Sequence, residues 1–155
     1  MSAAPKILFL SEASLFDAKS GAAQSVHAML RSLAEAGWSV RSVTMTLCDG
    51  EAEQPLSGLH QDLSDDVAAG DTACVLEHGG THELLVARST RHAALRPWEM
   101  RRYLELARER LVEVAPDIVL TYSSDALRPL LLEAQQRGAR TAFYVANPGY
   151  AQREG

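Results

Sequence analysis

The stretch "LFLSEASLFDAKSGAAQSVHAMLRSLAEAGWSVRSVT", residues 8–44, passes from an apolar segment through a polar loop into a helical pattern, then into a second apolar segment. The run at residues 6–11 lacks polar alternation, which is typical of a strand covered on both faces. Residues 22–36 place apolar side chains at helical spacing, and Gly37 stands where a left-handed residue would end the helix. The β-branched residues 39–46 predict a second strand, and the helical crossover makes the two strands parallel.

The rest of the chain continues the alternation of strands and helices. The further predicted elements are a hairpin around Gly79-Gly80, a helix over 97–114, a strand over 117–122, a helix ending at Gly138, and a strand over 140–147. This order predicts an α/β fold with an open, mostly parallel, Rossmann-like three-layer sheet. We expect one domain spanning residues 1–155.

Charge is unevenly distributed along the chain, whose net charge is −5. Residues 42–87 contain no lysine or arginine, and residues 49–71 form an acidic, glycine- and proline-containing surface excursion with one helical turn. The last 68 residues carry eleven arginines against eight acids, which is only a modest basic excess. We therefore do not expect a nucleic-acid partner.

Composition indicates a soluble protein, with 46% apolar and 23% charged residues. No run of about 18 apolar residues is long enough to span a bilayer, and the amino terminus does not read as a secretory signal. We expect a cytoplasmic location. Cys48 and Cys74 lack the paired spacing of a zinc site or a disulfide framework, so both are expected to be reduced thiols.

The first loop supplies candidate ligand-binding residues, because ligands of such sheets lie outside the carboxyl ends of the strands. Ser20, Gly21 and Ala22 lie where this loop enters the helix, without the glycines of a dinucleotide fingerprint or the GK[ST] of a P-loop. Gly21 can let backbone amides approach a phosphate or sugar oxygen. Alternatively, it only makes the turn.

Other candidates follow later strands. Tyr122, Ser123 and Asp125 offer hydroxyls and a carboxylate suited to sugar hydroxyls, although Ser124 or Asp125 could simply cap the next helix. Asn147 opens a turn after the last strand, which could equally be a connector. The five histidines are scattered, His27 reads as a surface residue, and no metal or cofactor is expected.

Two segments carry a resemblance to a known family. The chain resembles the amino-terminal domain of GT-B fold, retaining glycosyltransferases of the group 1 (family 4) type, whose first helix follows "GGAxxxxxxLAxxLxxxGHxVxVxT". The matching positions are Gly21, Ala22, Ala23, Leu33, Ala34, Gly37, Val40, Val43 and Thr44. The segment "PDIVLTYSSD", residues 116–125, is similar to the family's "PDVV" strand and sugar-site loop.

The resemblance implies hexose transfer from a nucleotide-sugar to a glycan or lipid-linked acceptor. This chain would be the acceptor-side domain, inactive alone and facing a carboxy-terminal donor-binding domain of the same protein, with peripheral membrane contact of the full-length protein. Ser20-Gly21 replaces the family's double glycine. Many members of the family carry a histidine in the loop after the "PDVV" strand. Leu120 to Ser123 contain none, so Tyr122 or Asp125 would serve in its place.

Fold alone leaves other functions open, because such sheets host many of them. One alternative is a stand-alone α/β module that binds a small ligand or a protein without catalysis. Another is a flavodoxin-like or nicotinamide-binding protein, which the lack of phosphate-loop glycines disfavours.

Overall fold

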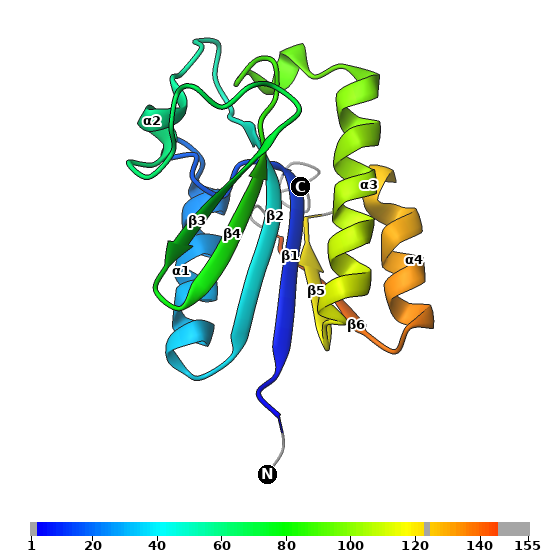
Figure 1. The fold of residues 1–155 in the computed structure, drawn as a ribbon. Coiled ribbons are helices and arrows are strands. Elements are labelled where there is room, and N and C mark those ends of the chain that lie inside the picture. Colours follow the sequence, from blue (N-terminus) through cyan, green and yellow to red (C-terminus); the bar gives the residue numbers. More distant parts are fainter. Residues whose placement is uncertain (1–2, 123–124, 146–155) are drawn as a thin grey trace, which may run out of the picture.

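The computed structural model describes residues 3–122 and 125–145, which form a mixed α/β fold built on a six-stranded sheet (Figure 1). The strand order is β3-β4-β2-β1-β5-β6. The strands are β1 (Lys6–Ala13), β2 (Ser39–Leu47), β3 (Thr72–Glu77), β4 (Gly80–Leu85), β5 (Ile118–Thr121) and β6 (Arg140–Phe143). The predicted α/β class and mostly parallel sheet are confirmed.

The first strand lies inside the sheet, as its apolar sequence predicts. β1 pairs in parallel with β2 on one side and with β5 on the other. β4 and β6 extend the parallel arrangement at β2 and β5 respectively, whereas β3 is antiparallel to β4. The predicted hairpin is therefore confirmed, with Gly79 at a φ of +81° in its turn.

Helices cover both faces of the sheet (Figure 1). α1 packs Val26 and Leu30 against one face, whereas α3 packs Tyr103 and Leu106 against the other, beside α4. The α-helices are α1 (Gly21–Glu35), α2 (Leu56–Leu59), α3 (Pro97–Val114) and α4 (Arg128–Gln136), with short 3₁₀ turns η1 (His92–Ala94) and η2 (Asp125–Leu127). None of the helices in these ranges is long and apolar enough to cross a membrane.

The boundaries differ from the predicted ones by a few residues. Gly37 and Gly138 follow α1 and α4 with φ of +97° and +92°, the left-handed conformation predicted from sequence. α1 begins one residue early, at Gly21, because Ser20 supplies the N-cap. β6 ends at Phe143, short of the predicted strand end.

The acidic excursion forms a cover over one end of the α1 face. Its single helical turn is α2, as predicted, and Leu56, Leu59 and Leu63 are buried in the cluster that α1 forms with the sheet. The Ser57 backbone N–H and hydroxyl donate to the Asp65 carboxylate at 2.8 and 2.9 Å, which links two parts of the 49–71 segment. Three apolar anchors therefore hold this polar segment in place.

Candidate functional site

The carboxyl edge of the parallel strands carries the residues predicted to bind a ligand. Ser20, Gly21 and Ala22 follow β1, and Tyr122 and Asp125 follow its neighbour β5, so the topology brings both groups to one edge. Ser123 and Asn147 lie outside the described residues. The role of all seven in ligand binding stays a prediction.

Gly21 is not required by the geometry of its turn. It is the first residue of α1, it is absent from the positions with positive φ, and a Cβ atom built on it meets no atom within 4 Å. The helix start is instead fixed by Ser20, whose Oγ accepts the N–H of Ala23 at 3.2 Å. The interpretation that Gly21 merely makes the turn therefore lacks a steric basis.

Tyr122 packs as an aromatic residue at the end of β5. Its ring lies edge-on to Phe9 at a centroid distance of 5.5 Å and edge-on to Tyr144 at 6.1 Å. Burial, with a smaller contribution from Tyr144, raises the pKa of Tyr122 to about 12. The phenol is therefore neutral at pH 7 and can act only as a hydrogen-bonding group.

Two pockets open beside the loop after β4, with volumes of about 470 and 410 Å³. Both are bordered by Glu53 and Arg88, and neither is lined by a residue predicted to bind a ligand. The larger pocket is lined by Glu53, Arg88, Ser89, Arg91, Ala93, Ala94, Leu95 and Arg96.

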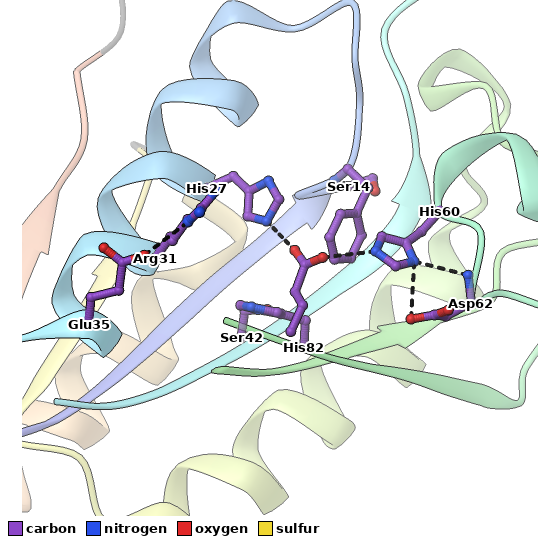
Figure 2. A network of polar contacts seen from close by, with 10 residues as sticks. Ser14, His27, Arg31, Glu35, Ser42, His60, Asp62 and His82 are labelled. Atoms are coloured by element: carbon purple, nitrogen blue, oxygen red, sulfur yellow. Dashed lines mark hydrogen bonds and ion pairs between the residues drawn. The ribbon is translucent and has the colours of Figure 1, made fainter. Parts of the chain in front are cut away.

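A second polar site, on the α1 face of the sheet, was not predicted from the sequence. Glu77 at the end of β3 contacts two histidines through its two carboxylate oxygens, as Figure 2 shows for His27 and His60. Oε1 meets Nε2 of His27 from α1, and Oε2 meets Nε2 of His60 at 2.9 Å. The side chains of His60 and Glu77 are 14% and 17% exposed, against 31% for His27.

The two histidines differ in what remains free on each ring. Nδ1 of His60 accepts the backbone N–H of Asp62 at 3.0 Å, so Nε2 must carry the proton donated to Glu77. Both nitrogens of His60 are therefore engaged. Nδ1 of His27 has no hydrogen-bond partner within residues 3–122 and 125–145, so it can accept a proton.

Glu77 is ionised at neutral pH. Burial alone would raise its pKa, but the hydrogen bonds from His60 and His27 outweigh burial, and the pKa of this carboxyl lies below its ordinary value of 4.5. A carboxylate held in this state orients the imidazole of His27 and stabilises it when it is protonated.

His82 on β4 joins His27, His60 and Glu77 in this group, which we call the histidine cluster. Nδ1 lies 2.7 Å from Oγ of Ser42 on β2, and the side chain is buried. Burial, followed by the nearby His27, lowers the pKa of His82 from 6.5 to about 4. The ring centroid of Phe16 lies between 5.0 and 5.9 Å from those of all three imidazoles, and the rings of His27 and His82 pack edge-on at 6.0 Å.

His27, predicted to be a surface residue, is partly exposed, with 31% of its side chain accessible. Its ring also contacts Glu77 of the β3–β4 hairpin, which extends the sheet beneath α1. In the described part of the chain, no set of three or more His, Cys, Asp and Glu side chains is arranged to hold a metal ion.

Access to the cluster is along a narrow crevice between α1 and the hairpin. Its walls include His27, Arg31, Glu77 and His82, and it has no room for a water-sized sphere. A molecule that bound here would therefore contact the partly exposed side chain of His27 instead of entering between the layers.

Comparison with known proteins gives one likeness to a solved structure. No family model matches the chain, and no curated protein matches it. The chain is similar to the crystal structure of the antimicrobial reagent A40926 pseudoaglycone deacetylase Dbv21, with a TM-score of 0.50 and 20% identity. The match covers 94% of this chain and 65% of that one, so this chain spans just under two thirds of that protein's length. At this identity the likeness shows the fold alone.

The prediction of a group 1 glycosyltransferase is wrong on these findings. The matching structure is a deacetylase, not a GT-B glycosyltransferase, and this overturns the family, the hexose-transfer function and the transferase activity together. The misleading signal was the strand, loop and helix of residues 8–44, a pattern that α/β folds of different function share. The predicted partners and the 1–155 domain boundary are not tested by these findings.

Proposed function

We propose that this chain hydrolyses an acetyl group from a carbohydrate-bearing substrate, with His27 as the general base. The observation that carries the proposal is the contact of His27 with the half-buried, ionised carboxylate of Glu77. A base oriented by a carboxylate is an arrangement that enzymes use to activate an attacking oxygen. The likeness of fold to a deacetylase supports acetyl as the group removed.

The reaction follows from the atoms left free in the cluster. Nδ1 of His27 takes a proton from water while the water oxygen bonds to the acyl carbon. The bond from that carbon to the leaving nitrogen or oxygen then breaks, and the imidazolium returns its proton to the leaving group. The products are acetic acid and the free amine or alcohol.

Neighbouring charges have distinct roles in this scheme. Glu77 stabilises the imidazolium that forms on His27. Arg31 borders the same crevice; its Nε is paired with Glu35 at 3.1 Å, so only its terminal N–H groups are assigned to the oxyanion that develops on the acyl oxygen. His60 is a positioning residue, because both of its nitrogens are engaged in holding Glu77 and Asp62.

The test is release of acetate from N-acetyl-D-glucosamine and from p-nitrophenyl acetate. We expect H27A to lose about 100-fold or more of the rate, the lower end of what a general base contributes. H92A is the matched control, because His92 is an exposed histidine outside the cluster. Acetate release by H27A at the wild-type rate, or none by the wild type on either compound, contradicts the proposal.

A reducing compartment fits the two cysteines. Cys48 is buried, Cys74 is exposed, and both thiols are free. Since cytosolic thiols are kept reduced, we propose the cytoplasm as the location of this chain.

A further inference from the structure

We propose that the pocket lined by Arg88, Ser89, Arg91 and residues 93–96, with Glu53 at its rim, binds the anionic group of a small organic molecule. Arg88, Arg91 and Arg96 line this pocket against the single carboxylate of Glu53, so its charge is positive. It lies at the carboxyl edge of the strands, where open α/β sheets bind their ligands. The site is separate from the histidine cluster, and the proposal does not depend on hydrolysis.

The backbone that carries the arginines is fixed at both ends. The buried Glu99 carboxylate accepts the N–H of Arg88 at 2.8 Å and that of Arg96 at 2.9 Å. Further along, Cys48 donates its N–H to the carbonyl of Thr90 at 2.7 Å and accepts the N–H of His92 at 3.2 Å. The arginines therefore project from a preorganised loop, which lowers the entropic cost of binding.

This pocket already holds one carboxylate of the chain itself. Glu53 accepts the hydroxyl of Ser89, and its Oε2 accepts both the N–H and the hydroxyl of Thr90 at 3.0 Å. The Nε atom of Arg91 lies 3.9 Å from Oε1. These hydrogen bonds, that of Ser89 foremost, lower the pKa of Glu53. The loop thus recognises a carboxylate by hydroxyl, amide and guanidinium groups together.

Two guanidinium groups remain for an external anion. Arg88 uses one nitrogen on the carbonyl of Ala94, at 3.0 Å, and neither Arg88 nor Arg96 has an ion pair within the described residues. A guanidinium matches the geometry of carboxylate and phosphate oxygens in a bidentate contact. Ala93, Ala94 and Leu95 provide apolar wall for an attached carbon skeleton.

The size of the pocket indicates more than an inorganic ion. A volume of about 470 Å³ lies in the range of small-molecule sites, about 300–1,000 Å³. Carboxylate and phosphate share the chemistry that this lining recognises, so the experiment must separate them.

Isothermal titration with three compounds that share a phenyl ring makes that separation. The probes are phenyl phosphate, benzoate and the neutral benzamide, each added to the full chain at low salt. We expect saturable binding of at least one anion at one site and none of benzamide. Binding of phenyl phosphate alone or of benzoate alone assigns the anionic group, and binding of both supports recognition of their shared charge. Binding of neither, or equal binding of benzamide, overturns the proposal.

Variants locate the site. R88A/R96A should weaken binding at least tenfold, and R96A alone should weaken it by a smaller factor without removing the Arg88 contact to Ala94. The matched control is R101A/R140A, which removes two exposed arginines outside the pocket and changes the net charge equally. Equal losses in the pocket variant and this control indicate a general charge effect and overturn the assignment.

Discussion

The imidazole of His82 lies directly against Gly80, so that a Cβ atom added at Gly80 would come within 2.9 Å of Nε2 of His82. The ring cannot move aside freely, because it is buried and hydrogen-bonded to Ser42. The imidazole of His82 thus occupies the space that a side chain at position 80 would need.

Replacing this glycine should destabilise the protein. We expect G80A to lower the free energy of unfolding by about 1–3 kcal/mol, the usual cost of overpacking a buried site. G21A is the matched control, because a Cβ there meets nothing within 4 Å, and it should change stability by less than about 0.5 kcal/mol. Urea denaturation of the three proteins checks this, and equal stability of G80A and G21A contradicts it.

Stability should fall as the pH is lowered from 6.5 toward 4. Burial lowers the pKa of His82 from 6.5 in the unfolded chain to about 4 in the folded one. Between these values the unfolded state binds a proton that the folded state does not, so acid favours unfolding. The shift corresponds to about 3 kcal/mol, present in full above pH 6.5 and lost by pH 4.

The variant H82Q isolates this effect. Glutamine keeps a hydrogen-bonding group near Ser42 but does not titrate, so the dependence of stability on pH between 4 and 6.5 should be shallower than in the wild type. The free energy of unfolding is measured in urea at pH 7.5, 6 and 5. Parallel curves for the two proteins would assign the acid sensitivity to other groups.

The sequence predicts the fold well and the histidine cluster poorly, for a physical reason. Apolar periodicity is local, so α3 is predicted to the residue and β1 is correctly placed inside the sheet. The cluster instead joins His27, His60 and Glu77 from three separate segments. These three residues come into contact only because the hairpin packs under α1 and the 49–71 segment folds back onto the same face. The spacing of residues within one helix or strand does not predict either of these tertiary contacts.

Tyr103 contributes a buried hydrogen bond between α3 and the sheet. Its hydroxyl donates to the carbonyl of Val43 at 2.7 Å, and its side chain is fully buried. We expect Y103F to cost about 1 kcal/mol, the net value of one such bond, whereas Y103A should cost about 3–5 kcal/mol because it also leaves a cavity. Thermal and urea unfolding measure both, and equal losses in the two variants contradict this division.

Glu99 should control the order of the arginine loop without touching its ligand. Its carboxylate accepts the N–H groups of Arg88 and Arg96 from within the protein. Removing it in E99A leaves two donors without their acceptor, which should cost about 3 kcal/mol and speed hydrogen exchange at these two amides. E99Q can accept at one oxygen only, so its loss of stability should be intermediate.

The control is E105A, at an exposed glutamate of the same helix, which should change stability by less than about 0.5 kcal/mol. Because the loop loses its preorganisation, E99A should also weaken binding of the anionic probes, and unchanged exchange at Arg88 and Arg96 would show that Glu99 does not hold the loop.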